Sequence, residues 1–305
     1  MRIVIIGQQA FGKAVLDAVL DAGKDEVVGV FCSPDRGGRE DPIKEGAQER
    51  GVPVFQPGRF RSQEAIQQFR SLSPDLCVMA FVIDIVPPEM LNAPKLGTIQ
   101  YHPSLLPKHR GPASINWAVI KGEEKTGLTI FWPDEGLDTG PVLLQKEVPI
   151  GPDDTVGSLY FDHLSPLGVE SMVEAIDLVR EGRAPKITQD EREATYESWV
   201  TDEDARIDWS KPVSQVYNLI RGCDPRPGAH TSLNGTRIRL FNCSRNDTET
   251  GADPGTVVHV DDDGFTVAAS GGTVFVRRVQ PPESRKVPAG EFATSHGLRA
   301  GDRLT

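Results

Sequence analysis

The stretch that decides the fold is RIVIIGQQAFGKAVLDAVLDAGKDEVVGVFC, from Arg2 to Cys32. It begins with an apolar run that ends at Gly7 and is typical of a buried strand. Apolar residues at helical spacing follow as far as Gly23, which indicates a helix and its end. A second apolar run begins at Glu26. Strand, helix and strand in this order predict a right-handed crossover between parallel strands.

The same alternation continues through the first half of the chain. We predict further helices over 41–51 and 62–72, and further strands over 52–55, 75–82, 96–102 and 127–133. The pattern predicts an α/β fold with a doubly wound, mostly parallel, Rossmann-like sheet. In such sheets ligands bind beyond the carboxyl ends of the strands.

The character of the sequence changes after residue 186. A helix is predicted near Pro212, and short β-like runs then alternate with Asp-Gly and Gly-Gly turns. This pattern predicts a small C-terminal β-barrel, similar to an OB fold. The predicted organisation is therefore an α/β domain over 1–186, a linker over 187–204 and the barrel domain over 205–305.

Composition restricts the class of protein. The chain has 305 residues, a formal net charge of −11 and a pI near 5.1, which argues against a dominant nucleic-acid surface. No apolar run reaches the roughly 18 residues that a membrane helix needs. The four scattered cysteines predict neither a metal site nor a disulfide frame, but buried reduced thiols. We expect a cytoplasmic protein without membrane contact.

The glycine-containing loop GQQAFGKA, which begins at Gly7, invites a nucleotide-binding interpretation. A dinucleotide fingerprint needs a glycine where Gln9 stands. A P-loop needs Ser or Thr after Lys13, where this chain has Ala14. The loop therefore predicts a tight turn between strand and helix, with no bound NAD(P).

The stretch TIQYHPSLLPKHRGP, from Thr98 to Pro112, brings polar side chains to the end of a predicted strand. Gln100 and His102 are two residues apart, so their side chains share one face of the strand. The prolines that follow His102 stiffen the next segment. There Leu105 contributes to an apolar wall that carries the Ser104 hydroxyl.

Acidic side chains follow the next predicted strand, in the loop PDEGLDTG. Asp134, Glu135 and Asp138 are expected at the same edge of the sheet as His102, where Asp138 would orient the imidazole. Singly, such residues are more often turn formers and buried polar groups. Together with the absence of G-x-S-x-G and HExxH motifs, they predict a direct-transfer or hydrolytic enzyme that uses His and Asp, without a covalent intermediate or a metal.

A longer stretch, YHPSLLPKHRGPASINWAVIKGEEKTGLTIFWPDEGLDTGPVL, resembles the signature of the 10-formyltetrahydrofolate-dependent formyltransferases. The resemblance extends over nearly the whole chain. Segments such as DDTVGSLYF and ATYE are most similar to the N-terminal hydrolase module of 10-formyltetrahydrofolate dehydrogenase, and methionyl-tRNA formyltransferase is next. The resemblance implies a formyltransferase domain over 1–186 and 10-formyltetrahydrofolate as formyl donor.

The resemblance also implies roles for particular residues. His102 and Asp138 occupy the catalytic positions, and Gln100 stands where the family has asparagine. A glutamine still donates an amide N–H, although its extra methylene moves the donor. Arg110 is expected to anchor its loop. The folate site is expected to contain eight residues: Phe81, Val82, Ile83, Asp84, Ile85, Ser104, Leu105 and Asp134.

The acceptor of the formyl group is left open between water, a small amine and methionyl-tRNA. The segment SPDRGGREDP is short, and its Arg36 and Arg39 are offset by acidic neighbours, which disfavours tRNA. A folate-binding scaffold without activity is disfavoured because His102 and Asp138 are both present. Without an aldehyde dehydrogenase portion, no NADP-dependent oxidation is expected.

Overall fold

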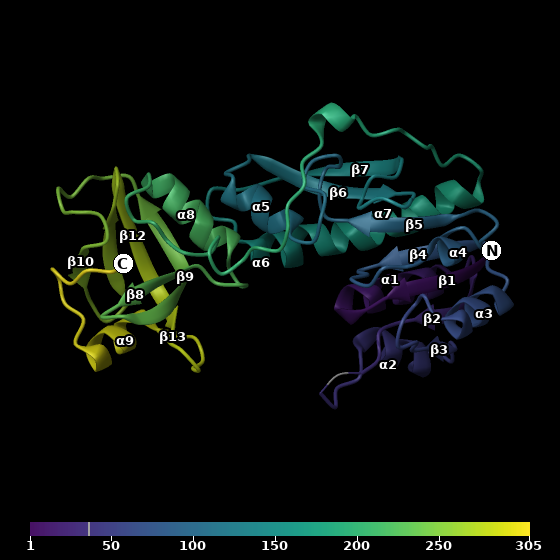
Figure 1. The fold of residues 1–305 in the computed structure, drawn as a ribbon, viewed down its shortest axis with the longest axis horizontal. Coiled ribbons are helices and arrows are strands. Elements are labelled where there is room, and N and C mark those ends of the chain that lie inside the picture. Colours follow the sequence, from purple (N-terminus) through teal and green to yellow (C-terminus); the bar gives the residue numbers. More distant parts are fainter. Residues whose placement is uncertain (36) are drawn as a thin grey trace. The chain divides into compact units, whose positions relative to one another are not determined.

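The computed structural model describes residues 1–35 and 37–305. Arg36, whose charge was considered above in the argument on tRNA, lies outside the described residues. The chain divides into two compact units (Figure 1). Unit 1 consists of Met1–Pro112, Gly127–Val148 and Asp162–Tyr196. Unit 2 consists of Ala113–Thr126, Pro149–Phe161 and Glu197–Thr305. The predicted linker is thus shared, since its first part lies in unit 1 and the rest, from Glu197, in unit 2.

Strands alternate with helices through most of unit 1. The strands are β1 (Arg2–Gly7), β2 (Glu26–Phe31), β3 (Val54–Phe55), β4 (Leu76–Ala80), β5 (Thr98–His102), β6 (Lys125–Phe131) and β7 (Val142–Pro149). The helices are α1 (Gln9–Ala22), α2 (Pro42–Glu49), α3 (Gln63–Ser71), α4 (Pro88–Leu91), the π-helix η1 (Leu159–Leu164), α7 (Ser165–Arg180) and the 3-10 helix η2 (Glu191–Glu193). The strands form one seven-stranded sheet in the order β3-β2-β1-β4-β5-β6-β7. The elements alternate as the sequence predicts for the strands β1 to β6 and the helices α1 to α3, whereas β7, α4, α7 and the short helices η1 and η2 were not predicted.

Alternation along β1 explains why helices cover both faces of this sheet. Ile3 and Ile5 pack into a cluster with α1, α2 and α7, whereas Val4 and Ile6 pack with α3 and α4. All four side chains are at most 1% exposed. A strand buried on both faces has no polar positions, and this is why the sequence of β1 is a continuous apolar run.

The strands β1 to β5 are parallel, which confirms the predicted fold class. The direction of β6 corrects one step of the prediction. β6 runs antiparallel to β5, with Gln100 opposite Phe131 and His102 opposite Thr129. The carboxyl end of β6 therefore lies beside the middle of β5, not beside His102. The argument that Asp138 meets His102 because their strands end at the same edge is wrong, and the loop after β6 must turn back.

Unit 2 is built on a second sheet. Its strands are β8 (His230–Leu233), β9 (Thr236–Asn246), β10 (Val257–Val260), β11 (Phe265–Ala269), β12 (Gly272–Gln280) and β13 (Val287–Pro288). Its helices are α5 (Ser114–Ile120), α6 (Val156–Ser158), α8 (Val213–Gly222) and α9 (Ala289–His296). The order β10-β11-β12-β9-β8, with β13 on β12, is antiparallel wherever strands pair, as a β-barrel-like C-terminal domain requires.

The core of unit 2 lies between this sheet and two helices. Val213, Val216 and Ile220 place the apolar face of α8 in the same cluster as Phe265 and Phe292. The sequence predicted the start of α8 correctly: Pro212 is the residue immediately before the first helical residue, Val213. Proline is well tolerated at the start of a helix because its missing N–H is not needed there. The sequence did not indicate some other elements of unit 2, which are short: α5, α6, β8, β13 and α9.

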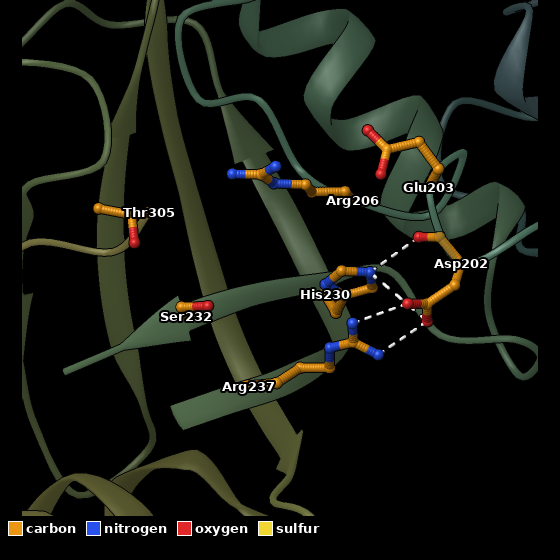
Figure 2. A pocket seen from close by; sticks show the side chains of 7 residues that line it. All are labelled: Asp202, Glu203, Arg206, His230, Ser232, Arg237 and Thr305. Carbon is orange, nitrogen blue, oxygen red and sulfur yellow. Dashed lines mark hydrogen bonds and ion pairs between the residues drawn. The ribbon is translucent and has the colours of Figure 1, made fainter. Parts of the chain in front are cut away.

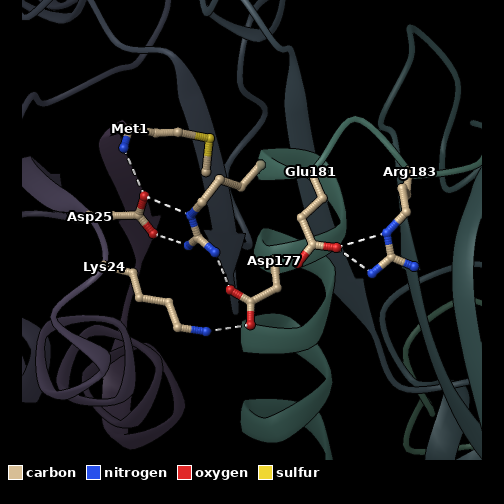
Figure 3. A network of polar contacts seen from close by, with 7 residues as sticks. Met1, Lys24, Asp25, Asp177, Glu181 and Arg183 are labelled. Atoms are coloured by element: carbon tan, nitrogen blue, oxygen red, sulfur yellow. Dashed lines mark hydrogen bonds and ion pairs between the residues drawn. The ribbon is translucent and has the colours of Figure 1, made fainter.

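A network of ion pairs and hydrogen bonds lies near the amino-terminal ends of β1 and β2 (Figure 3). The carboxylate of Asp25 accepts from the Met1 ammonium at 2.8 Å and pairs with Arg180 at the end of α7. Asp177 pairs with Arg180 and with Lys24, the latter at 2.8 Å. Asp25 is only 3% exposed, so it ties β1 and the loop before β2 to α7.

Within residues 1–35 and 37–305, no helix is both long and apolar enough to span a bilayer. The four cysteines are free thiols. Burial raises the pKa values of Cys32, Cys77 and Cys223 to about 12, so these thiols stay protonated at neutral pH.

Candidate active site

His102 is the last residue of β5, and its ring is fixed by the loop that follows it. The ring is buried, with 5% of the residue exposed. Nε2 lies 2.9 Å from the carbonyl oxygen of His109. A carbonyl oxygen only accepts, so Nε2 carries the hydrogen. Nδ1 is then the nitrogen available for proton exchange, and it lies 3.7 Å from Oδ2 of Asp138.

Asp138 reaches His102 from the loop between β6 and β7. Its Oδ2 atom accepts a hydrogen bond from the backbone N–H of Gly111 at 2.9 Å. Its φ of 56° lies in the left-handed region that residues with a side chain rarely adopt. Such strain persists only where neighbouring groups enforce it, and it is frequent at functional sites. Oδ1 has no hydrogen-bond partner among the described residues and is free to accept a proton or hydrogen bond.

Gln100 lies on the same strand as His102, one position before the buried Tyr101. Gln100 is half-buried, and within the described chain its side-chain amide forms no hydrogen bond. Because Gln100 and His102 are two apart on β5, they share one face. An unused amide donor therefore lies on the same face as the imidazole.

The loop after β4 presents apolar side chains to solvent. Phe81, Ile83 and Ile85 are 40%, 60% and 69% exposed. No backbone N–H of Val82–Ile85 donates a hydrogen bond within residues 1–35 and 37–305. Met79 pairs with Gln100, so this loop leaves β4 beside the last residues of β5. Exposed apolar groups beside free amides suit a flat, heteroaromatic ligand with hydrogen-bond acceptors.

The other residues predicted to bind the ligand have different surroundings. The Ser104 side chain is fully buried, and its hydroxyl donates to the Lys108 carbonyl oxygen at 2.7 Å. Leu105 is half-buried. Asp134 is exposed and accepts from the Gly136 N–H and the Thr139 hydroxyl. Asp84 is also exposed and accepts from Ser33. Ser104 and Asp134 thus hold their own loops together.

Arg110 is completely buried and anchors the loop after β5. Its guanidinium donates to Oε1 of Gln189 at 2.8 Å and to Oε1 of Glu191 at 2.6 Å, and it also contacts the Tyr196 hydroxyl. The hydrogen bond to Glu191 raises the pKa of Arg110 and lowers that of Glu191. We refer to residues 187–196, which supply these partners, as the strap.

The strap connects directly to the backbone around both candidate catalytic residues. Nε2 of Gln189 donates to the carbonyl oxygens of Asp138 and Gly140, at 2.9 and 2.7 Å. Thr195 accepts from the N–H groups of His109 and Arg110, at 2.8 and 2.9 Å. The strap therefore holds the loop that orients His102 and the loop that carries Asp138.

Sequence reasoning missed the strap because it read residues 187–204 as a linker. The stretch is charged and irregular, and no motif marks Gln189 or Thr195. The sequence carried no signal for the strap; it became recognisable once the structure showed Arg110 buried, since a guanidinium in a core needs acceptors from elsewhere in the chain.

The glycine-containing loop after β1 is a tight turn, as predicted. A Cβ on Gly7 would lie 2.7 Å from the carbonyl oxygen of Ala80, so glycine is required by close packing. Lys13 pairs with Asp17 at 2.7 Å within α1.

Comparison with known proteins assigns the family. Residues 1–176 match the family described as "Formyl transferase", and residues 200–297 match "Formyl transferase, C-terminal domain". The chain belongs to the formyl transferase family. This confirms the resemblance read from the sequence and makes the protein a member of an enzyme family.

Two relatives of this formyl transferase are matched over very different shares of their own length. It is 45% identical to cytosolic 10-formyltetrahydrofolate dehydrogenase of Mus musculus over 251 residues, which is 81% of this chain but 28% of that protein. It is 41% identical to methionyl-tRNA formyltransferase of Symbiobacterium thermophilum over 313 residues, which is 100% of this chain and 95% of that protein. The chain thus spans about a quarter of the dehydrogenases and nearly all of the tRNA enzyme.

Solved structures share the fold. HypX from Aquifex aeolicus in complex with tetrahydrofolic acid superposes with a TM-score of 0.72 at 21% identity, over 99% of this chain and 48% of that chain. WlaRD, a sugar 3N-formyl transferase, has a TM-score of 0.69 at 17% identity, over 93% of this chain and 99% of that chain. At these identities the likeness concerns the fold alone. No cluster of three or more metal-ligating side chains occurs in the described part of this chain.

Proposed function

We propose that this formyl transferase takes the formyl group from 10-formyltetrahydrofolate and delivers it to an amine or to water. The observation that carries the proposal is the approach of Nδ1 of His102 to the Asp138 carboxylate at 3.7 Å, with the unpaired Gln100 amide on the same face of β5. The loop after β4 leaves its strand beside Gln100. The named folate substrate of the 45%-identical dehydrogenase supports the choice of donor.

The exposed loop over 81–85 fits a folate. Its three apolar side chains would cover the flat pterin, and the free N–H groups of Val82–Ile85 would donate to the ring acceptors. When bound, the folate supplies the formyl group to be transferred. Ser104 and Asp134 would act indirectly, by fixing the loops around the donor, because their polar atoms already have partners.

Gln100, His102 and Asp138 would have different roles in the transfer of the formyl group. The Gln100 amide, and His102 when Nδ1 also carries a proton, would donate hydrogen bonds to the formyl oxygen as negative charge develops there, a contribution of about 10²–10³ in rate per donor. Asp138 would accept a proton from the attacking water or amine and return it to the departing folate nitrogen, a contribution of about 10²–10⁴. His102 carries its fixed hydrogen on Nε2, so it is Nδ1 that would act toward the substrate.

A second candidate is methionyl-tRNA as the acceptor. The full-length match to the Symbiobacterium enzyme favours it, because both units of this chain are covered. The net charge of −11 opposes it, since phosphate backbones need compensating basic groups. The two candidate functions differ only in the acceptor of the formyl group, and the proposed roles of His102 and Asp138 are the same in both.

The test is turnover of 10-formyltetrahydrofolate by the purified chain, alone and with methionyl-tRNA or small amines, with the formylated product identified by mass spectrometry. Consumption of the donor in water alone supports hydrolysis. Acceleration by methionyl-tRNA that falls steeply with salt would establish the second candidate. No consumption with any acceptor would overturn the proposal.

A further inference from the structure

The hollow beside β8 in unit 2 is balanced in charge by its own side chains (Figure 2). Its lining contains the carboxylates of Asp202 and Glu203 and the guanidinium groups of Arg206 and Arg237. Arg237 holds both carboxylate oxygens of Asp202, at 2.8 and 2.7 Å. Nε2 of His230 lies 2.9 Å from the carbonyl oxygen of Asp202. These contacts tie the segment before α8 to β8 and β9, so this polar cluster serves the fold of unit 2.

A second polar cluster lies in unit 1, where three neighbouring strands end. Gln8 comes after β1, Ser33 after β2 and Asp84 after β4. These strands are parallel and adjacent in the order β2-β1-β4, so their carboxyl ends meet at one edge of the sheet. The strand order reverses between β1 and β4, and ligands of such sheets bind at a reversal of this kind.

The hydroxyl of Ser33 joins the three side chains. Its Oγ lies 2.8 Å from Oδ2 of Asp84 and 3.1 Å from Oε1 of Gln8. A hydroxyl has one hydrogen, and a hydrogen bond to a carboxylate is stronger than one to an amide, so Ser33 donates to Asp84. A half-turn of the Gln8 amide then makes Nε2 the donor to Ser33. The result is a chain of hydrogen bonds from Gln8 through Ser33 to Asp84.

The fold fixes one end of this chain of hydrogen bonds more firmly than the other. Gln8 is only 6% exposed, and its backbone N–H donates to the carbonyl oxygen of Ala80 at 3.3 Å. Ser33 is half-buried, and its carbonyl oxygen accepts from Nε2 of Gln56 at 3.0 Å. Asp84 is exposed. The Ser33 hydroxyl is therefore the fixed point, and Asp84 is the group that it holds.

The loop over 81–85 has no other polar tether. Within residues 1–35 and 37–305, the hydrogen bond from Ser33 to Asp84 is the only one that any atom of these five loop residues forms. Phe81 has a φ of 60°, in the left-handed region that a bulky residue adopts only where its surroundings enforce it. Phe81, Ile83 and Ile85 are exposed, so packing contributes little to fixing the loop.

We propose that Ser33 is a positioning residue for folate binding, which holds the loop over 81–85 through Asp84 so that its N–H groups face the pterin. The inference rests on the proposed function, because the folate is the ligand proposed for this loop. A loop that is ordered before binding loses less conformational entropy when the ligand arrives, so the tether contributes to affinity.

The same contacts predict that Ser33 affects binding and not the chemical step. Within the described residues, neither Ser33 nor Asp84 forms a hydrogen bond or ion pair with Gln100, His102 or Asp138. Loss of the Ser33 hydroxyl should therefore raise KM for the folate donor and leave kcat nearly unchanged.

The experiment measures binding of tetrahydrofolate to the full chain by calorimetry, and KM and kcat for 10-formyltetrahydrofolate. Ser33→Ala should raise Kd and KM about tenfold, as expected for the loss of one hydrogen bond to a charged group, with kcat within twofold. Ser33→Thr keeps a hydroxyl and should restore binding. Ser71→Ala removes an exposed hydroxyl at the end of α3 and is the control, which should bind as the unchanged protein does.

A double-mutant cycle separates a tether from two independent contacts with the ligand. Asp84→Ala breaks the same hydrogen bond and should weaken tetrahydrofolate binding to a similar extent. The double variant should then bind no more weakly than either single variant. Additive losses, about hundredfold in the double variant, would overturn the proposal. So would binding by Ser33→Ala that stays within twofold of the unchanged protein.

The two assays also separate this inference from the proposed function, because tetrahydrofolate carries no formyl group. Binding of tetrahydrofolate without turnover of the donor would contradict the proposed transfer, and the cycle would still decide the role of Ser33. Normal turnover with unchanged binding by Ser33→Ala would reject the role of Ser33 alone. A lowered Tm with an unchanged Kd would show that Ser33 supports only the fold. No binding of tetrahydrofolate to the unchanged protein would overturn both proposals.

Discussion

Nδ1 of His102 lies 3.7 Å from Oδ2 of Asp138, and the backbone of one short loop holds both side chains. The carbonyl of His109 fixes the imidazole, and the N–H of Gly111 fixes the carboxylate. The distance is longer than a hydrogen bond, so the pair is oriented without being tied together. Each residue therefore keeps one atom free for a substrate.

The first prediction concerns this pair. His102→Ala and Asp138→Asn should each lower kcat for the folate donor by at least about 10², since each removes a group that exchanges or stabilises charge in the transition state. Steady-state kinetics on the purified variants measure the effect. His163→Ala removes an exposed histidine of the same unit and should be without effect. Rates within twofold of the unchanged enzyme would reject the proposed roles.

A second prediction tests the amide at position 100. Gln100→Ala should cost about 10²–10³ in kcat, because it removes a donor to the formyl oxygen. Gln100→Asn restores an amide of shorter reach and should recover most of the activity. Gln67→Ala, an exposed glutamine on α3, serves as the control. Activity of the Gln100→Ala variant within twofold of the unchanged enzyme would show that the amide takes no part.

The strap gives a third prediction. Gln189→Glu keeps an acceptor for Arg110 but loses the donor to the carbonyl oxygens of Asp138 and Gly140. Buried acceptors without a donor cost about 1–3 kcal/mol each, so the Asp138 loop should loosen. We expect kcat to fall about tenfold or more with KM little changed. Unchanged kcat together with a lowered Tm would show that Gln189 supports folding but does not position Asp138.

A fourth prediction concerns stability and pH. Burial would raise the pKa of Asp25, but hydrogen bonds from Arg180 and the Met1 ammonium outweigh it and hold the pKa below its ordinary value. A depressed carboxyl pKa contributes stability above the unfolded value of about 3.9 and loses it as pH falls through the folded value.

Asp25→Asn should therefore lower the free energy of unfolding by about 2 kcal/mol at pH 7, and the difference should shrink below about pH 4. Urea unfolding at several pH values measures it. Asp190→Asn breaks an exposed pair with Arg192 and should cost less than about 1 kcal/mol. A difference that stays constant from pH 7 to strongly acidic conditions would contradict the assignment.

The sequence by itself determined the order and type of most elements. β1, α1 and β2 follow from apolar runs and a glycine stop, because burial on both faces of a parallel strand leaves a continuous apolar signature. His102 and Gln100 could be chosen from their place at the end of β5. Their residue types and their two-residue spacing along one strand can be read directly from the sequence, without knowledge of the tertiary structure.

Only the tertiary structure decided how Asp138 reaches His102 and what holds both. The direction of β6 is set by pairing with β5, which no local pattern records. The strap became visible only once Arg110 was found buried, since its partners lie about 80 residues away along the chain. Contacts between distant segments arise from packing, and packing cannot be read from one segment at a time.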